Sequence, residues 1–400
     1  KTASGTTIRA RRNSATGEWL PAAGNLVVRC DSSTALNPGD RAVVRGKIYP
    51  FTARHGGYGR LMTRRGYVGT LYLNRSSLLL RDTLHRELSP KHLSLFLHER
   101  AVARLDRLAL APDEQALCNA MTAGDRRSLS PALRAAYSRS GTSHLLAVSG
   151  LHVGIVFLLA NLLLWWLPLF RHGHILRNIA VILLIWLYAA TTGFPPSVVR
   201  AALMFSVLQF ALASSSEYVG MNTLAGVAFV MLLFHPDYLF DISFQLSFIA
   251  VAGIIAWGLP LCRLLRTRRK SIDMLTATLA IGFSASAATA PLISHTFGQI
   301  SVVGLALNPV VILLSYVVVG SCTLWLVIPG TALAPLFSVV AGFAARAQNE
   351  LIRAAAALPA AALDIRLTTT QCWIVYGLFI FATLLLWSAE RKKSVSSLPE

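Results

Sequence analysis

The hydrophobic and polar positions divide the chain into a mixed N-terminal part and a strongly apolar remainder. From about residue 144 onward, apolar runs of bilayer length recur, since a bilayer core needs about 20 apolar residues per helix. This pattern predicts a polytopic α-helical membrane protein. The predicted spans are 144–167, 175–192, 197–213, 220–235, 243–260, 273–294, 303–328 and 371–388, with a less apolar ninth candidate at 331–346.

Residues 1–97 follow a different pattern, in which short β-branched and aromatic runs are separated by turn residues. The runs NLVVRC, RAVVRGKIY and GYVGTLYL predict strands, and LNPGD predicts a turn between the first two. About five short strands predict a small N-terminal all-β domain, and their number favours an OB-like barrel.

Basic residues in the short loops predict the orientation of the spans. RLLRTRRK (263–270) contains five basic residues and no acid, which marks the cytoplasmic side, and RHGHILR (171–177) lies two loops earlier on the same side. We therefore expect an extracytoplasmic OB-like domain. The predicted domains are this OB-like domain (1–97), an amphipathic helical connector (98–143), a transmembrane domain of eight or nine spans (144–390) and a tail (391–400) that is cytoplasmic if the ninth candidate crosses.

Composition supports the membrane prediction and adds a strong positive charge. The chain is 54% hydrophobic and 14% charged, and its net charge is +19. The first 100 residues contain 17 Lys and Arg against 6 Asp and Glu, a balance of +11. Such a basic domain favours a polyanion or an anionic membrane surface as partner. The alternative is that these arginines are ordinary surface residues without a specific partner.

Several motifs of catalysis and metal binding do not occur in the sequence. It has no nucleotide-binding G-x-x-x-x-G-K-[ST], no metallohydrolase H-x-H-x-D-H and no G-x-S-x-G. The five cysteines include no C-x-x-C, and a disulfide between Cys30 and Cys118 remains open. We therefore predict no catalytic residue, no metal, no cofactor and no nuclease activity. A start at Lys1, without Met or a signal peptide, indicates a fragment or a trimmed chain.

The first polar cluster in the apolar region lies in GTSHLLAVSGLHVGIV, residues 141–156. On a helix, Ser149 and His152 share a face, and His144 lies two turns before His152. Gly150 and Gly154 form a G-x-x-x-G that lets another helix approach closely. Polar groups in hydrocarbon need partners, so this cluster predicts a polar path; a tight helix contact is the alternative.

Two further clusters occur in TTGFPPSVVRAALM and HPDYLFDISFQLSF. Arg200 follows a helix start at two prolines, and either enters the bundle or extends to the interface. Asp237, Asp241 and Gln245 are spaced by four, which predicts one polar stripe at a helix start, although Asp241 alone could serve as an N-terminal cap. Arg200 and Asp241 could pair.

These segments resemble the ComEC competence family, the inner-membrane channel for transforming DNA. The motifs that carry the resemblance are YGRLMTRRGYVGTLYL, TAGDRRSLSPALRAAYSRSG, GTSHLLAVSGLHVGIV, TTGFPPSVVRA and DISFQLSF, in order from about residue 20 to beyond 320. Three features depart from the family: no span precedes the OB-like part, no β-lactamase-like metallohydrolase domain follows, and ARHGGYG replaces an Asn-Pro-Gly-x-Phe-Asp.

The resemblance implies a multi-pass channel that passes single-stranded transforming DNA across the bacterial inner membrane. It also implies a DNA receptor outside, and a cytoplasmic ATPase or single-strand-binding protein inside. The alternatives are an intramembrane hydrolase using Ser149 with His152, and a small-solute permease. The candidate residues are His144, Ser149, His152, Arg200, Asp241 and Gln245 for the path, Gly150 and Gly154 for helix packing, and Arg45, Lys47, Arg60, Arg64 and Arg65 for DNA binding, with Tyr49, Phe51, Tyr58, Tyr67 and Tyr72 available for stacking.

Overall fold

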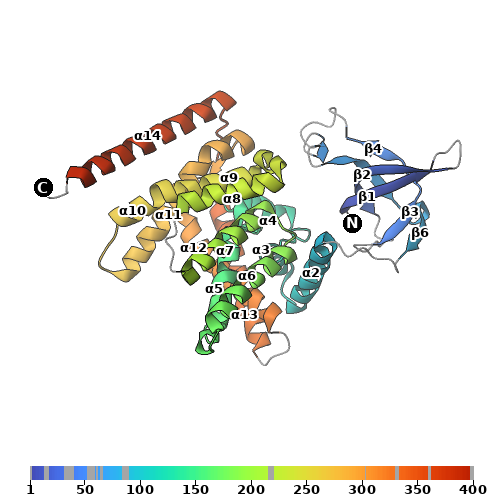
Figure 1. Ribbon diagram of the computed structural model, residues 1–400, viewed down its shortest axis with the longest axis horizontal. Helices are drawn as coiled ribbons and strands as arrows, with labels where there is room; N and C mark the ends of the chain where they lie inside the picture. Colours follow the sequence, from blue (N-terminus) through green and yellow to red (C-terminus); the bar gives the residue numbers. More distant parts are fainter. Residues whose placement is uncertain are drawn as a thin grey trace. The chain divides into compact units, whose positions relative to one another are not determined.

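The computed structural model divides the chain into two compact units, Lys1–Phe96 and Leu97–Glu400, which we call the β unit and the helical unit (Figure 1). The division lies next to the domain boundary expected at residue 97. The structure describes residues 2–12, 18–30, 40–51, 59, 62–63, 66–82, 90–214, 220–301, 303–328, 333–358 and 362–396.

The β unit contains two sheets. In the larger one, with the order β1-β2-β5-β4, β2 pairs antiparallel with β1 and parallel with β5, while β4 pairs antiparallel with β5. β3 and β6 form a separate antiparallel pair. The strands are β1 (Thr2–Arg12), β2 (Trp19–Cys30), β3 (Arg41–Val44), β4 (Ile48–Pro50), β5 (Tyr67–Leu73) and β6 (Leu78–Asp82), with a short helix η2 (Arg75–Ser77) before β6.

Alternation along β2 and β5 gives the β unit its small core. Leu26 and Val28 on β2 and Leu71 and Leu73 on β5 are buried against one another, because every second side chain of a strand points to the same face. The prediction of a small N-terminal β domain is confirmed, whereas closure into an OB-like barrel stays a prediction. The turn LNPGD lies mostly outside the described residues.

The helical unit begins with short amphipathic helices and continues with long apolar ones (Figure 1). Helix α2 crosses the boundary between the units. The earlier helices are α2 (Pro90–Leu105), η3 (Asp106–Leu108), α3 (Pro112–Thr122), α4 (Pro131–Arg139), η4 (Ser143–Leu146), α5 (Gly150–Leu163), η5 (Leu167–Leu169), α6 (Gly173–Thr191) and α7 (Pro196–Ser214).

The later part of the helical unit packs α11 against α9 and pairs α12 with α13. A π-helical segment (Ile254–Gly258) joins α9 to α10. These elements are α8 (Gly220–Phe234), η6 (Pro236–Phe240), α9 (Ile242–Gly253), α10 (Leu259–Leu264), α11 (Lys270–Phe297), β7 (Ile300–Ser301), α12 (Val303–Val327), α13 (Ala334–Ala357), β8 (Ala362–Leu363) and α14 (Thr369–Ser396).

The described helices include five that are long and apolar enough to cross a membrane. Leu158 and Leu162 on α5, and Trp165 just after it, are 58–65% exposed, a surface suited to lipid. The prediction of a polytopic helical membrane protein is therefore confirmed. The five segments are Gly150–Leu169, Gly173–Thr191, Ile242–Leu264, Ile272–Phe297 and Ala306–Val327, and shorter apolar helices cover Pro196–Ala211, Gly220–Phe234 and Thr369–Leu384.

Several predicted details need correction. The first span was expected to begin at residue 144. Instead, residues 143–146 form the short helix η4, and α5 begins only at Gly150. The ninth candidate corresponds to α13, which is longer than expected and does not meet the criteria for a span; whether it crosses stays a prediction. None of the five cysteines, all of which lie in the described part of the chain, forms a disulfide, so the Cys30–Cys118 disulfide is wrong, and Cys118 is buried in the core that contains Cys322.

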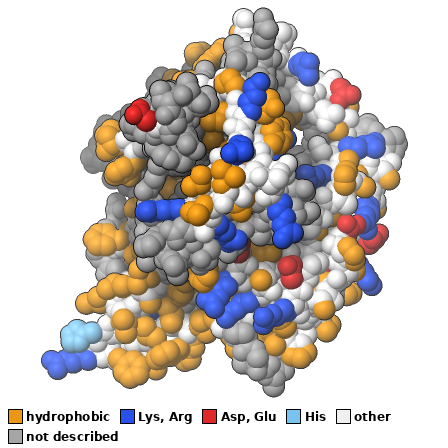
Figure 2. Space-filling view, turned by 90° about the vertical axis from the view of Figure 1, so that its right-hand side faces the viewer, with side chains coloured by type: hydrophobic (Ala, Val, Ile, Leu, Met, Phe, Trp, Pro, Cys, Tyr) orange, Lys and Arg blue, Asp and Glu red, His pale blue; other side chains and the backbone are white. Residues whose placement is uncertain are grey.

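The molecular surface carries the positive charge over a wide area. In the face drawn in Figure 2, Lys and Arg side chains are more widespread than Asp and Glu. Hydrophobic side chains gather at the lower left of the same view. The surface therefore combines a basic character with apolar areas suited to lipid.

Candidate functional site

Four helices of the helical unit meet around the start of α5. The Ser197 hydroxyl at the start of α7 donates to the Val148 carbonyl oxygen over 2.9 Å. A Cβ on Gly124, just after α3, would lie 3.3 Å from the Val148 side chain and 3.7 Å from the carbonyl oxygen of Thr192, just after α6. We call this meeting point of α3, α5, α6 and α7 the α5 junction.

Local sequence chemistry sets the turns that bring these helices together. Gly124 has φ +82°, in the left-handed region that glycine enters at little cost. Pro196 occupies the first turn of α7, where the missing backbone N–H of proline does no harm. Gly193 and Phe194, which precede it, also have positive φ, of +84° and +53°. Positive φ is costly for a phenylalanine, so the surrounding packing holds this turn in place.

Ser149 and His152 are in direct contact at the N-terminus of α5. The backbone N–H of Ser149 donates to His152 Nδ1 over 2.9 Å, and Ser149 Oγ lies 3.2 Å from the same nitrogen. Because Nδ1 accepts from an N–H, the neutral ring carries its proton on Nε2. The pair therefore caps the helix, which is a reciprocal bonding pattern of helix starts.

His144 belongs to a different element from His152. It lies in η4, and the backbone is extended at Ala147 and at Ser149, so that α5 starts anew at Gly150. The expectation that His144 and His152 lie two turns apart on one continuous helix is therefore wrong. The physical reason is the cap, since a residue in the N-cap position has non-helical φ and ψ.

Both glycines of the G-x-x-x-G face α7. A Cβ on Gly150 would lie 2.9 Å from Arg200 Nη2, and one on Gly154 would lie 3.3 Å from Phe205 Cζ. A side chain at Gly150 would displace the Arg200 guanidinium, and one at Gly154 would require the Phe205 ring to shift. The two glycines thus let α7 approach α5 closely enough for the Arg200 guanidinium to lie against the first turn of α5.

Arg200 is buried inside the bundle, with 6% of its surface exposed. Its Nη1 donates to the Ser247 carbonyl oxygen on α9 over 3.0 Å, and its Cζ lies 5.8 Å from the centroid of the Phe248 ring. The sequence left open whether this arginine enters the bundle or extends to the membrane interface, and in the structure it lies inside the bundle. Such a buried cation requires polar partners, because an unpaired charge in a medium of low dielectric constant is costly.

The α5 junction also buries polar atoms that have no hydrogen-bond partner in the described part of the chain. These atoms come from four helices, α3, α5, α6 and α7. They are Thr122 Oγ1, His152 Nε2, the Tyr188 hydroxyl and Arg200 Nε. Buried polar groups in folded proteins are nearly all hydrogen-bonded, so each of these four atoms is an exception that water or a polar ligand could satisfy.

Asp241 and Gln245 lie at the start of α9. Asp241 caps the helix, since its Oδ1 accepts from the backbone N–H groups of Ser243 and Phe244 over 2.8 and 3.4 Å. Gln245 Nε2 donates to the Leu239 carbonyl oxygen over 2.8 Å. The predicted stripe of Asp237, Asp241 and Gln245 on one helix is wrong, because only Gln245 lies within α9.

α9 reaches Arg200 through its backbone at Ser247, one half-turn beyond Gln245. The Asp241 carboxylate is engaged with its own helix start, while the Arg200 guanidinium bonds to a carbonyl. Of the predicted path residues, the structure thus joins Ser149 to His152 and brings Arg200 against Gly150.

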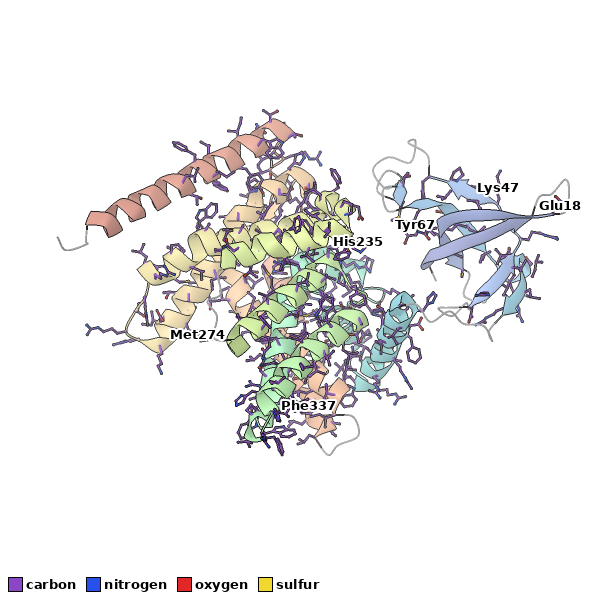
Figure 3. All side chains as sticks on the ribbon, viewed as in Figure 1. Glu18, Lys47, Tyr67, His235, Met274 and Phe337 are labelled. Carbon is purple, nitrogen blue, oxygen red and sulfur yellow. The ribbon has the colours of Figure 1, made fainter. Side chains whose placement is uncertain are left out.

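The candidate DNA-binding residues lie in the β unit. Arg45 and Lys47 are exposed on the segment between β3 and β4, and Figure 3 labels Lys47 together with Tyr67 on β5. Arg60, Arg64, Arg65 and Tyr58 lie outside the described residues. No group of three or more His, Cys, Asp or Glu side chains that could hold a metal ion occurs in the described ranges.

Sequence reasoning missed several polar residues of the bundle. Ser197 ties α7 to Val148, and Gln209 Nε2 on α7 donates to Asn178 Oδ1 on α6 over 2.7 Å. Tyr188 and Thr122 place buried hydroxyls in the α5 junction. A polar residue inside an apolar run was the available signal for Asn178, Tyr188 and Gln209, whereas Thr122 lies in a segment that gives no such contrast.

Two known proteins are similar to this chain in sequence. ComE operon protein 3 of Bacillus subtilis (strain 168) is 33% identical over 204 residues, which cover 50% of this chain and 24% of that protein. An uncharacterized protein of Aquifex aeolicus (strain VF5) is 29% identical over 201 residues, which cover 50% of this chain and 45% of that protein. The matches thus span less than half the length of these two relatives. No solved structure matches.

The family comparison covers most of the helical unit. The model of the family described as Competence protein matches residues 121–392, which is more than half of the chain. The matched region contains nearly all of the α5 junction and the candidate spans. The chain is a membrane protein that belongs to the Competence protein family.

Proposed function

We propose that the helical unit is a conduit for single-stranded DNA across a bacterial inner membrane during natural transformation. Family membership and the resemblance of five ordered motifs support this function. The structural observation that most directly supports this function is the α5 junction. There, four helices bury polar atoms without partners in the described residues, and an arginine lies inside the bundle. A phosphate or base edge passing there would meet hydrogen-bond donors in place of lipid.

The orientation of the spans follows from their basic loops. Five Lys and Arg between residues 263 and 270 favour the cytoplasm for this loop and, four crossings earlier, for residues 171–177. The start of α5 and the start of α7 then face the outside, where DNA arrives. A DNA receptor would deliver the strand there, and a cytoplasmic ATPase or single-strand-binding protein would draw it inward.

The geometry favours a conduit over an intramembrane hydrolase. His152 Nδ1 accepts from the backbone N–H of Ser149, so the nitrogen next to Ser149 Oγ is already engaged. The other nitrogen has no partner in the described residues that would orient the ring. A working nucleophile needs a base that is free to take its proton and is held by a third group.

The test is DNA uptake by a naturally competent host that depends on this protein. His152→Ala and Arg200→Gln should lower import of labelled DNA and the number of transformants about tenfold or more, since loss of a hydrogen bond to a charged group costs roughly 1.5–3 kcal/mol. Leu158→Ala, on the exposed face of α5, is the matched control and should transport normally. Normal uptake by both junction variants at wild-type protein levels would contradict the proposal.

Thiol labelling gives a second readout that is independent of transformation. In a variant without the five native cysteines, cysteines at positions 149, 152 and 245 should react with a water-soluble reagent. One at position 158 should not, because Leu158 is 58% exposed on an apolar face and would contact lipid. Equal, low reactivity at positions 149, 152 and 158 would place the polar path elsewhere.

A further inference from the structure

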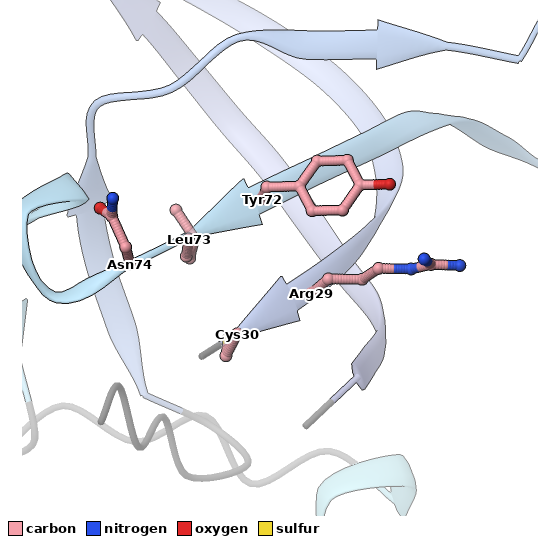
Figure 4. A pocket seen from close by; sticks show the side chains of 5 residues that line it. All are labelled: Arg29, Cys30, Tyr72, Leu73 and Asn74. Atoms are coloured by element: carbon pink, nitrogen blue, oxygen red, sulfur yellow. The ribbon is translucent and has the colours of Figure 1, made fainter. Parts of the chain in front are cut away.

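The larger sheet of the β unit presents an arginine beside a tyrosine on its exposed face. Arg29 on β2 is paired in register with Tyr72 on β5, and the Arg29 Cζ lies 5.8 Å from the centroid of the Tyr72 ring. The Tyr72 side chain is 54% exposed. Figure 4 shows the ring and the arginine side chain extending in the same direction from neighbouring strands.

The neighbouring strand β4 continues this arrangement. The Tyr49 ring, 51% exposed, lies with its centroid 5.8 Å from that of Tyr72 at an interplanar angle of 79°. The Nζ of Lys47, the exposed residue just before β4, lies 6.0 Å from the centroid of the Tyr49 ring. The order across the sheet is therefore cation, ring, ring, cation. We call Arg29, Tyr72, Tyr49 and Lys47 the aromatic row.

The aromatic row lies on the face of the sheet opposite the core. Val28 and Leu71, which precede Arg29 and Tyr72 along their strands, are buried with 1% and 5% exposure. Strand alternation then directs Arg29 and Tyr72 away from the core. The aromatic rings are thus not needed to fill the interior, and two adjacent half-exposed tyrosines form a surface that is available to a flat partner.

A hollow of about 290 Å³ lies at one end of the aromatic row. It is lined by Arg29, Cys30, Tyr72, Leu73 and Asn74 (Figure 4). The hollow combines a guanidinium, a phenol ring and an amide side chain. These groups suit a nucleotide, whose phosphate pairs with a cation and whose base stacks on a ring.

We propose that the aromatic row is a stacking platform for single-stranded DNA on the β unit. The inference rests on the proposed function for the identity of the polymer. Bases of the strand stack on Tyr72 and Tyr49, and its phosphates pair with Arg29 and Lys47. A single strand is favoured over a duplex because a duplex keeps its base faces inside its own stack. The platform does not read sequence, since every base has a face that can stack.

The experiment uses the whole chain in a neutral detergent and a fluorescent oligothymidine. Tyr72→Leu should weaken binding about 5-fold to 100-fold, because base–aromatic stacking contributes roughly 1–3 kcal/mol per base. The slope of log affinity against log salt should not change. Tyr72→Phe keeps the ring and should bind nearly as the wild type does, which separates stacking from the phenol hydroxyl.

Substitution of the two cations should change the salt dependence of binding, which the Tyr72 variants leave unchanged. Arg29→Gln and Lys47→Gln should each reduce the magnitude of the salt slope by about 0.7, the value for one phosphate contact on a single strand. Arg41→Gln is the matched control, since Arg41 is an exposed arginine on β3 of the other sheet. It should leave the slope unchanged.

Wild-type affinity in both Tyr72→Leu and Tyr49→Leu, with unchanged thermal unfolding, would overturn the proposal. So would competition by duplex DNA that equals competition by single strands. The DNA conduit and the stacking platform can fail separately. If variants of the aromatic row bind DNA normally while His152→Ala stops uptake, the platform is wrong and the conduit stands. If the row variants bind DNA weakly while His152→Ala takes up DNA normally, the platform is supported and the path at the α5 junction is refuted.

Discussion

The α5 junction and the interface between α4 and α13 both bury polar side chains, but they differ in how those side chains are bonded. At the α4–α13 interface, the Tyr137 hydroxyl donates to Asn349 Oδ1 over 3.1 Å, Gln348 Nε2 donates to the Tyr137 oxygen over 3.2 Å, and Asn349 Nδ2 donates to the Asp113 carbonyl over 3.2 Å. Tyr137, Gln348 and Asn349 are at most 2% exposed, and each side chain takes part in at least one of these hydrogen bonds, although Gln348 Oε1 has no partner in the described residues.

The four polar side chains of the α5 junction are at most 8% exposed, and two of them, Thr122 and Tyr188, have no hydrogen-bond partner for their only side-chain polar atom among the described residues. Paired polar groups fix one packing arrangement, because any other packing leaves them unbonded. Unpaired ones destabilise the fold and persist where a ligand or water completes their bonding. Under the proposed function, this difference separates an interface that serves stability from a site that serves passage, and four predictions test it.

The largest expected effect concerns the glycine that lets α7 reach α5. Gly154→Leu should sharply lower the amount of folded protein, because its Cβ alone would lie 3.3 Å from Phe205 Cζ and overpacking costs about 1–3 kcal/mol or more. Gly226→Leu on α8 is the control, since a Cβ there meets nothing within 4 Å. Size-exclusion chromatography of the solubilised protein measures the folded fraction. Similar yields for the two variants would show that the α5–α7 contact is loose.

The second prediction compares one hydroxyl from each region. Tyr137→Phe removes a hydroxyl that bonds two buried amides, and should cost about 1–3 kcal/mol in the free energy of unfolding. Thr122→Val removes a hydroxyl without a partner in the described residues, and should change stability by no more than roughly 0.5 kcal/mol. Thermal unfolding in detergent measures both. A large loss in Thr122→Val would show that its hydroxyl is bonded, and the contrast between the regions would disappear.

Five of the predicted spans correspond to helices that are long and apolar enough to cross a membrane, because hydropathy depends on composition alone. The N-terminal boundary of the first span could not be read in the same way. Residues 144–149 are apolar enough to continue a helix, and the turn depends on the cap formed by Ser149 and His152. In the β unit, β1 (Thr2–Arg12) escaped prediction because small and polar residues obscure its alternation.

Sequence patterns pointed to Ser149, His152 and Arg200 at the α5 junction, but not to Thr122 or Tyr188, and not to the contacts that these residues make. A spacing of three correctly joined Ser149 to His152, although their bond belongs to a cap and not to a helix face. The environment of Arg200 depends on which helix packs beside α7. That helix is α9, which contributes a carbonyl oxygen and a ring from residues 247 and 248, more than 40 positions away in the sequence. Such long-range pairing leaves no local signal.

The third prediction concerns the cap itself. Ser149→Ala should lower the free energy of unfolding by about 0.5–2 kcal/mol, the usual cost of losing a capping side chain. DNA uptake per folded molecule should persist, because the backbone N–H of residue 149 can still bond His152 Nδ1. Uptake and thermal unfolding are measured on the same variant, with Ser149→Thr as the conservative control. Loss of uptake without loss of folding would favour a chemical role for the hydroxyl.

The smallest expected effect is a pH dependence in the turn between α3 and α4, next to the bonded interface. Burial of Asp125 raises its pKa, but hydrogen bonds and the positive charge from Arg127 outweigh burial, so the pKa lies below its ordinary value of 3.8. A lowered folded-state pKa means that the ionised carboxylate stabilises the fold above the ordinary value. This contribution is lost as the pH falls through the folded-state pKa.

Asp125→Asn should therefore be slightly less stable than the wild type near neutral pH, and the difference should shrink as the pH falls below about 4. The expected size is below about 1 kcal/mol, because the Arg127 side chain is 66% exposed and water screens the pair. Arg127→Gln should show the same convergence, since it removes the other partner. Thermal unfolding at neutral and acidic pH measures it. If the stability difference between the wild type and Asp125→Asn instead grows toward low pH, the Asp125 carboxyl is bonded in its protonated form. The ion pair with Arg127 would then not be what stabilises this turn.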